Sequence, residues 1–233
     1  MAKISVVVPA YDEEKRIGKT LEIILKYLKS RKYNFEMIVI NDGSKDNTKK
    51  VVEKFKKVKL ISYFPNHGKG YAVRKGILES KGDYVLFCDA DLSTPIEELD
   101  DFMKYIKNYD IVIASRALKE SRIKALKHRK LLGRIFAFFV KLLAVRGIQD
   151  TQCGFKLFSK EASKKIFSKQ TINGWAFDVE VLFIARKLGY KIKEVGVKWQ
   201  HFNHKDVTPT KHSFKMLKEV LKVRGNSIIG KYK

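Results

Sequence analysis

The chain has 233 residues, and 45% of them are hydrophobic, which is enough for one large domain with a substantial core. Lys and Arg number 49 against 25 acidic residues. The formal net charge of +24 therefore predicts an anionic partner: nucleic acid, an anionic lipid surface or a phosphorylated substrate. No run of about 18 apolar residues occurs, so we expect no transmembrane helix. The start of the chain does not resemble a signal peptide, and two cysteines without metal-ligand spacing indicate a reducing compartment.

Apolar segments alternate with amphipathic ones over the first half of the chain. The strands predicted from apolar runs are residues 4–8, 35–40, 58–64, 84–88 and 110–114. The helices predicted between them are 13–28, where apolar residues recur at three- and four-residue spacing, and 48–55, 71–79 and 96–107. This alternation predicts a doubly wound, mostly parallel α/β sheet with right-handed crossovers. Farther along, we expect a helix at 181–188, a strand at 192–199 and a helix at 213–223.

The predicted strands end in polar turns, which meet at one edge of a parallel sheet, where the ligand crevice of such folds lies. The buried strand 84–88 runs directly into Asp89-Ala90-Asp91. Two carboxylates at this edge suit a divalent ion that bridges a phosphorylated ligand. The structural alternative is a loop carboxylate followed by a helix cap, because the Asp-x-Asp pattern is common. The other strand ends carry residues 9–13, 41–44, 66–70 and 115–116, which bring acidic, basic and Gly residues to the same edge.

Gly68, Gly70 and Gly76 depart from the two familiar phosphate-binding motifs. Their spacing is G-x-G-x₅-G, whereas dinucleotide-binding folds have G-x-G-x-x-G, and the sequence contains no G-x-x-x-x-G-K-[ST]. A helix N-terminus with Lys69 beside it could still bind an anion through its backbone N–H groups. Equally, the glycines could serve only to form the turn, and the sequence leaves both alternatives open.

Residues 117–148 differ in kind from the rest of the chain. Residues 131–145 are apolar nearly all round, and the basic residues Lys127, Arg134 and Lys141 recur every seven positions and share one face. At 1.5 Å per residue this helix spans roughly 22 Å, too short to cross a bilayer. It is suited to lie in a membrane interface, although a core helix with outward-reaching charges fits the same pattern.

Two polar groups follow this segment. Residues 150–156 (DTQCGFK) are predicted to form a loop too polar for the core. Asp178 and Glu180 stand at the start of the next predicted helix, where they could simply complement the helix dipole.

Nucleic-acid binding is the alternative class that a pI near 9.9 suggests. The sequence contains no helix-turn-helix, RNP or zinc pattern, so we expect no specific nucleic-acid partner. A sugar nucleotidyltransferase would need a Gly-rich loop with a catalytic basic residue after the first strand, and residues 10–14 supply acids there instead.

Several motifs together resemble the GT-A domain of inverting family-two glycosyltransferases: ISVVVPAYDEE, VINDGSKDNT, NHGKGYAVRKG and the Asp-x-Asp strand. In the second half, DTQCGFKLF, GWAFDVEVL and EVGVKW resemble the dolichyl-phosphate β-glucosyltransferases, which are relatives of dolichyl-phosphate mannosyltransferase. The resemblance covers essentially the whole chain. It implies one GT-A domain over residues 1–233, with residues 117–148 as an interfacial amphipathic segment within it.

The resemblance implies a metal-dependent, inverting transfer of a hexose from a nucleoside-diphosphate sugar to a polyprenyl phosphate such as dolichyl phosphate. UDP-glucose is the favoured donor; GDP-mannose, or a hydroxyl acceptor, is the alternative. Asp91 would bind Mg²⁺ or Mn²⁺, and the catalytic residues would be Asp91, Arg116 and Asp178. The residues implied to bind the nucleotide sugar are Pro9, Tyr11, Glu13, Asp42, Lys69, Asp89, Ala90, Lys205 and Lys211. Those implied to face the acceptor and its phosphate are Arg129, Arg134 and Gln152.

The sequence departs from the family pattern at two positions. Asp12 stands where Asn is common, and Ser93 replaces a Gln that binds the metal in mannosyltransferase relatives, which leaves the second metal ligand open. A lipid phosphate, with a second pKa of about 6, is already an anionic nucleophile and needs no strong general base. We therefore expect Asp178 and Glu180 to orient the acceptor or the loop 150–153. The expected location is the cytoplasmic face of a membrane, with peripheral association.

Overall fold

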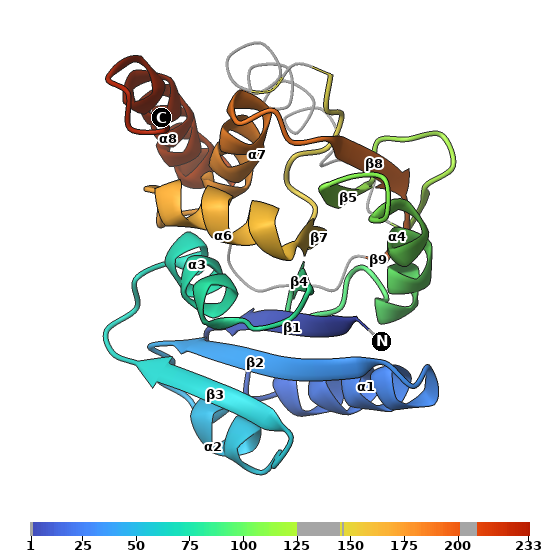
Figure 1. Ribbon diagram of the computed structural model, residues 1–233. Helices are drawn as coiled ribbons and strands as arrows, with labels where there is room; N and C mark the ends of the chain where they lie inside the picture. Colours follow the sequence, from blue (N-terminus) through green and yellow to red (C-terminus); the bar gives the residue numbers. More distant parts are fainter. Residues whose placement is uncertain (1, 125–144, 146, 201–208) are drawn as a thin grey trace.

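A seven-stranded sheet forms the centre of the molecule in the computed structural model, which describes residues 2–124, 145, 147–200 and 209–233 (Figure 1). The strand order is β3-β2-β1-β4-β7-β5-β8. Neighbouring strands are parallel except at β7, which is antiparallel to both β4 and β5. The predicted doubly wound, mostly parallel sheet is confirmed. Its strands are β1 (Lys3–Ala10), β2 (Asn34–Asp42), β3 (Val58–Tyr63), β4 (Tyr84–Cys88), β5 (Ile111–Ser115), β7 (Phe155–Ser159) and β8 (Ile192–Gly196).

Helices cover both faces of this sheet, and one buried apolar cluster lies on each face (Figure 1). Side chains alternate across the pleat, so Val7 of β1 joins one cluster while Val6 and Val8 join the other. On the Val6 side lie α1 (Ile17–Ser30), α2 (Thr48–Glu53), the short 3-10 turn η1 (Ile96–Glu98) and α4 (Leu99–Tyr105). On the Val7 side lie α3 (Lys69–Glu79), α6 (Lys160–Lys169), α7 (Phe177–Lys187) and α8 (Pro209–Ile228).

The predicted helix 13–28 is present, but it begins later, at Ile17. The apolar spacing that predicts it is also the spacing of its buried residues. The four residues before it form a turn instead, because Asp12 has a left-handed backbone (φ 53°) and the backbone N–H of Arg16 donates to Glu13 O (2.9 Å). Residues 12–14 lie against the loop after β2, since the backbone N–H groups of Asp12, Glu13 and Glu14 donate to side chains of residues 44–48.

The expectation that residues 150–156 form a loop too polar for the core is wrong. Cys153, Phe155 and Lys156 are buried, and β7 begins at Phe155. The strand lies between β4 and β5, so both of its faces are covered by helices, and the charge of Lys156 is matched by a buried carboxylate. α6, which follows directly, is not predicted because only its inner face is apolar and the rest is Lys-rich.

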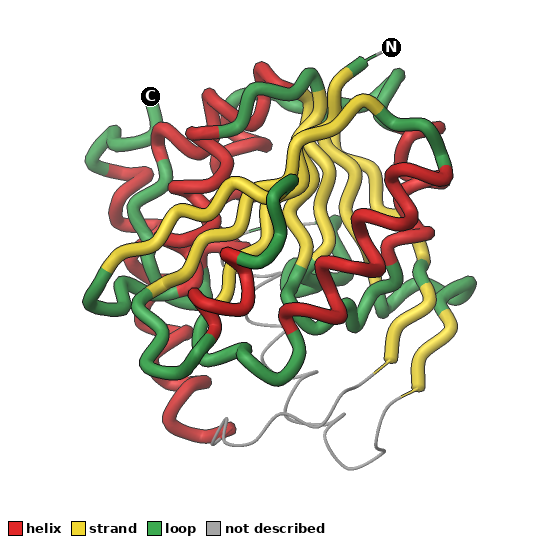
Figure 2. The backbone as a smooth tube through the Cα atoms, turned by 90° about the horizontal axis from the view of Figure 1, so that it is seen from below, coloured by secondary structure: helices red, strands yellow, loops and turns green. Residues whose placement is uncertain are grey.

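The predicted strand 192–199 is divided in two. β8 ends at Gly196, and β9 (Lys198–Gln200) pairs instead with β6 (Arg122–Lys124) in a separate two-stranded parallel sheet, seen apart from the main sheet in Figure 2. The predicted interfacial helix 131–145 lies outside the described residues apart from the buried Val145. In the part of the chain that is described, no helix is both long and apolar enough to cross a membrane.

Candidate functional site

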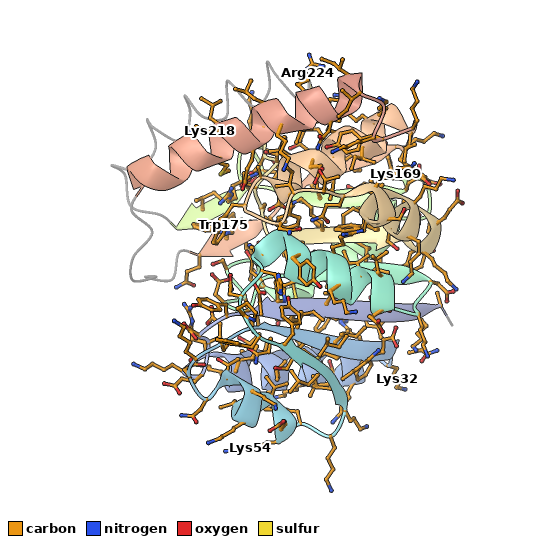
Figure 3. The ribbon with its side chains drawn as sticks, turned by 90° about the vertical axis from the view of Figure 1, so that its left-hand side faces the viewer. Lys32, Lys54, Lys169, Trp175, Lys218 and Arg224 are labelled. Atoms are coloured by element: carbon orange, nitrogen blue, oxygen red, sulfur yellow. The ribbon has the colours of Figure 1, made fainter. Side chains whose placement is uncertain are left out.

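The turn after β4 holds Asp89-Ala90-Asp91 at the carboxyl edge of the sheet. Trp175 lies on this edge in Figure 3, and Lys32, which precedes β2, marks the opposite one. Thr20 Oγ1 on α1 donates to Ala90 O (2.6 Å). The partly exposed Asp91 carboxylate accepts from both the backbone N (2.8 Å) and Oγ (2.9 Å) of Ser93. Ser93 therefore holds the Asp91 carboxylate through two hydrogen bonds.

Lys69, the first residue of α3, holds Asp89. Its Nζ lies 2.6 Å from Asp89 Oδ1 and also 4.9 Å from the ring centroid of Trp175. Burial lowers the pKa of the Lys69 ammonium, but the neighbouring carboxylates, Asp89 first, outweigh burial and raise its pKa overall. Lys69 is thus a permanent positive charge beside the Asp89–Asp91 turn.

Gly154 lies directly against the carboxylate of Asp89. A Cβ added to Gly154 would lie 1.9 Å from Asp89 Oδ2, and Gly154 O accepts from the backbone N of Asp89 (3.0 Å). The segment before β7 therefore forms one wall of the site, and a side chain at residue 154 would displace the Asp89 carboxylate.

Arg116, which follows β5, is joined to Asp150 of the same wall. Its backbone N and Nε donate to Asp150 Oδ2 (2.9 and 2.7 Å) and its Nη2 to Oδ1 (3.0 Å), and its guanidinium lies 5.4 Å from the ring centroid of Trp199. Burial would raise the pKa of the Asp150 carboxyl, but the hydrogen bonds and charge of Arg116 hold it below its ordinary value. The two-point contact fixes the guanidinium plane, and a third of the Arg116 side chain remains exposed.

Asp178, at the start of α7, is bound to a buried lysine. Lys156 is fully buried and Asp178 is 2% exposed. Lys156 Nζ donates to Asp178 Oδ1 and to Cys153 O (2.7 Å), which ties Asp178 to the loop before β7. Burial raises the pKa of the Asp178 carboxyl, and the charges of Lys156 and then Lys69 oppose that rise. The expectation that Asp178 orients this loop agrees with the contacts.

The parallel expectation for Glu180 is wrong. Its carboxylate is fully buried and accepts from the backbone N of Thr171 (3.0 Å) and of Ile172 (2.7 Å) and from Tyr232 Oη (2.6 Å). Glu180 lies two residues after Asp178 and points to another side of α7. Its carboxylate therefore binds the segment before α7 and Tyr232 instead of the loop 150–153.

Asp42, at the end of β2, shapes the loop that leads into α3. Its Oδ1 accepts from His67 N (2.8 Å) and its Oδ2 from Gly68 N (2.9 Å). Gly70 N donates to Asn173 O (2.8 Å), and a Cβ on Gly70 would lie 2.6 Å from the backbone oxygen of Ile172. Of the two alternatives for these glycines, the structure favours the turn and close packing, because the backbone N–H groups of Gly68 and Gly70 already have protein acceptors.

The residues after β1 line the same edge. Pro9 and Ala10 end the strand, and the Tyr11 side chain is partly exposed. Glu13 accepts from Arg16 Nε (2.8 Å) and Nη2 (2.9 Å). Tyr11 is the member of this group that is open to a ligand.

Four of the expected ligand-binding residues cannot be placed. Arg129, Arg134, Lys205 and the side chain of Lys211 lie outside the described part, so their roles stay predictions. Gln152 is described, and its Nε2 is buried without a hydrogen-bond partner among the described residues.

The sequence pattern does not reveal that Lys156, Asp150 and Gly154 belong to the site. The one signal for Lys156 is a single Lys inside an apolar run, FKLF, and a pattern of that kind does not reveal which carboxylate it meets.

The carboxylates suit a divalent cation whose remaining ligands come from a bound substrate and from water. Within the described ranges no three His, Cys, Asp or Glu side chains come together as a complete metal site. Mg²⁺ usually keeps several waters and takes one or two protein carboxylates together with substrate phosphates. Asp91 is partly exposed, which fits that role, and the neighbouring Asp89 forms the ion pair with Lys69.

Comparison with known proteins decides the family. The family model described as "Glycosyl transferase family 2" matches residues 5–167. This chain is a family 2 glycosyltransferase. It is 39% identical to the dolichyl-phosphate beta-glucosyltransferase of Dictyostelium discoideum over 99% of this chain and 76% of that protein. It is 38% identical to the human dolichyl-phosphate beta-glucosyltransferase over 99% of this chain and 78% of that protein.

Solved structures of other glycosyltransferases share the fold of this enzyme. Mannosyl-3-phosphoglycerate synthase from Rubrobacter xylanophilus aligns with a TM-score of 0.74 at 17% identity, covering 97% of this chain and 74% of that one. Glucosyl-3-phosphoglycerate synthase from Mycobacterium tuberculosis, in complex with Mn²⁺, UDP and phosphoglyceric acid, aligns with a TM-score of 0.69 at 21% identity, covering 98% and 79%. The GT-A fold expected from the motifs is confirmed.

Proposed function

We propose that this glycosyltransferase moves glucose from UDP-glucose to the phosphate of a polyprenyl phosphate of the dolichyl type, with the help of Mg²⁺ or Mn²⁺. Relatives that carry the names of dolichyl-phosphate glucosyltransferases support the acceptor and the sugar. A structural neighbour crystallised with Mn²⁺ and UDP-glucose supports the donor and the metal.

The observation that carries the choice of acceptor is the burial of Asp178. A hydroxyl acceptor needs a general base that reaches its proton. Asp178 is 2% exposed and its carboxylate is bound to the buried Lys156, so it is poorly placed to take a proton from a substrate in the crevice. A phosphate acceptor needs no such base, because it is already an anion at neutral pH.

The fixed cations of the site suit a reaction between two anionic substrates. Lys69 and Arg116 are each held by a carboxylate, so their charges are preorganised and cost little reorganisation when charge develops on the leaving diphosphate. Asp91 would hold the divalent cation, which would act as a Lewis acid on the leaving diphosphate. Gln152 Nε2 is buried and has no hydrogen-bond partner among the described residues, so we assign it to a phosphate oxygen of the bound substrate.

Asp91→Asn tests the metal assignment. Asn keeps the size of the side chain and an oxygen that can accept from Ser93 N, so the turn survives while the anionic ligand is lost. We expect glucose transfer to fall by about a thousandfold or more, as for the loss of a group that stabilises transition-state charge. Calorimetry should show that UDP binding no longer strengthens when Mn²⁺ is added. Asp101→Asn, an exposed carboxylate on α4, is the matched control and should be fully active; near-normal turnover of Asp91→Asn would contradict the assignment.

The donor is tested by calorimetric titration of UDP-glucose and GDP-mannose in the presence of Mn²⁺. We expect the uridine nucleotide to bind more tightly, and tighter binding of GDP-mannose would replace the glucosyl donor with the alternative mannosyl donor. Turnover with polyprenyl phosphate and none with the corresponding alcohol would support the acceptor.

The same proposal places the enzyme peripherally on the cytoplasmic face of a membrane, where a polyprenyl phosphate is presented. Residues 131–145 are the segment whose sequence suits that contact. Charge reversal of Lys127, Arg134 and Lys141 should then lower its partition onto anionic vesicles, and unchanged partition would reject that role for the segment.

A further inference from the structure

The outer side of α8 exposes three large apolar side chains. The exposed fractions are 52% for Leu221, 85% for Ile228 and 68% for Ile229, which follows the helix. Leu221 and Ile228 are seven residues apart and therefore share one face. The inner side of the same helix is buried in the core through Val220 and Val223. An apolar face of this kind on an outermost helix marks an interaction surface.

The charges around these side chains are positive. Lys218, Lys222 and Arg224 are exposed on α8, and Figure 3 shows Lys218 and Arg224 on the outward side of that helix. The one carboxylate among residues 216–231, that of Glu219, turns inward and accepts from the backbone N of Ala176 (3.2 Å). A helix that exposes apolar and basic residues together is suited to lie among anionic lipid headgroups. A second copy of the chain would bring like charges together, so it is the less favoured occupant.

Direct contacts connect α8 to the candidate site. The Glu219 contact attaches α8 to the turn that carries Trp175, and the ring of Trp175 lies against Lys69. Trp175 is itself about half exposed, as is common for Trp at a membrane–water boundary. The half of α8 around Lys218 and Glu219 is therefore the part of this surface nearest the Asp89–Asp91 turn, whereas its last residues lie beside the far end of α7, where Lys187 Nζ donates to Ser227 O (3.3 Å).

We propose that the outer face of α8, formed by Lys218, Leu221, Lys222, Arg224, Ile228 and Ile229, docks this enzyme onto an anionic lipid surface. The proposal rests on the proposed function insofar as the acceptor is a membrane lipid. It names a contact on the described part of the molecule that is separate from residues 131–145.

Co-sedimentation of the full chain with vesicles tests the apolar part of the surface. The vesicles are phosphatidylcholine alone or with phosphatidylglycerol in a three-to-one ratio. We expect Leu221→Ser/Ile228→Ser/Ile229→Ser to lower the partition coefficient about tenfold or more, because apolar area no longer enters the interface. Ile23→Ser/Leu78→Ser removes exposed apolar side chains from α1 and α3 and should leave partition unchanged.

A charge-matched pair of variants tests the basic part. Lys218→Glu/Lys222→Glu/Arg224→Glu should abolish the preference for vesicles that contain phosphatidylglycerol. The control Lys19→Glu/Lys26→Glu/Lys29→Glu changes the net charge equally, but on α1, which covers the opposite face of the sheet. It should keep most of the preference. An equal loss in both variants would mean that net charge, and not this face, binds the vesicles, which would overturn the proposal.

Activity separates this proposal from the proposed function. The α8 variants should match the wild type on a short-chain, water-soluble polyprenyl phosphate and lose activity only on a long-chain acceptor in vesicles. If the wild type binds vesicles through α8 but transfers no glucose, the proposed function is contradicted and the proposed docking surface is supported. If the apolar triple variant partitions onto vesicles as the wild type does, the proposal is overturned. It is also overturned if light scattering shows that the wild type is a dimer and that only the apolar triple variant is not.

Discussion

A single buried lysine, Lys156, binds both the segment before β7 and Asp178. Lys156 stands in the middle of the sheet, where an unpaired charge would be very costly, and its two acceptors come from a loop and from α7. Through these two contacts, Lys156 on β7 fixes the position of the Asp178 side chain and of the Cys153 backbone. Both cysteines are buried as free thiols, and burial raises the pKa of Cys153 to about 11, so it remains protonated at neutral pH.

Lys156→Met should destabilise the enzyme strongly. It leaves the Asp178 carboxylate buried without its partner, a change that costs about 3–5 kcal/mol in proteins. Lys156→Met/Asp178→Leu, which replaces the pair by apolar side chains, should recover much of that loss. Urea unfolding measures both free energies. A double variant as unstable as the sum of its two single variants would show that the pair is not coupled.

Asp178→Asn should cause only a modest loss of activity on a phosphate acceptor. The substitution keeps an oxygen that can accept from Lys156 Nζ and removes only the charge, so we expect kcat to fall by less than about tenfold, well short of the loss of a general base. The measurement is steady-state kinetics below the unfolding transition of the variant. A drop of several orders of magnitude would restore Asp178 as a base and would argue for a hydroxyl acceptor.

At the scale of elements, β7 and the loop before it complete the site. The loop brings Asp150 to Arg116 and Gly154 to Asp89, so two strand ends that are separated in the sheet order are connected through it. The short antiparallel strand thus carries function as well as core packing.

Gly154→Ala should impair catalysis more than stability. The new Cβ cannot stay 1.9 Å from Asp89 Oδ2, so the carboxylate must leave its place beside Lys69. We expect kcat/KM for glucose transfer to fall about a hundredfold, as for misplacement of a group by about 1 Å. Thermal unfolding and steady-state kinetics should be measured on the same preparation. Gly225→Ala, a helical position with open space around it, is the control and should have wild-type kinetics on a soluble acceptor.

The sequence predicts the first half of the fold well and the second half poorly, for identifiable reasons. The strands up to β5 are apolar runs between polar turns, so their period reveals them. The apolar run of β7 is interrupted by Lys156, whose partner Asp178 lies on another element. The predicted strand 192–199 is divided at Gly196, where the side chain of Glu120 occupies the space that a Cβ would take. The motif residues Asp89, Asp91 and Arg116 are predictable from their positions after strands. The pairings of these residues with Lys69, Ser93 and Asp150 depend on tertiary contacts that the sequence does not reveal.

The whole molecule is strongly cationic, and because each internal ion pair uses one acidic and one basic side chain, such pairs leave the net charge of +24 unchanged. Excess charge of one sign stores repulsion in the folded state, and the ligands of the proposed reaction would relieve it locally. The same excess favours encounter with anionic lipid.

Salt should therefore raise the thermal stability of the ligand-free enzyme. The screening length falls from about 30 Å at 0.01 M to about 8 Å at 0.15 M, which weakens repulsion between lysines on different elements more than it weakens direct ion pairs. Differential scanning fluorimetry across this range should show a rising unfolding temperature. A falling temperature would mean that surface ion pairs contribute more than the net charge.

The place of β7 in the sheet also has a consequence for how the chain is made. Synthesis proceeds from the amino end, so β5 leaves the ribosome well before the strand that separates it from β4, and β8 follows later still. Until residues 155–159 emerge, β4 has an open edge, and β5 has neither of its neighbours. The nascent chain can assemble β1 to β4 early, but its central sheet closes only after β7 and β8 have emerged, and we expect chaperones that shield strand edges to act on it during that interval.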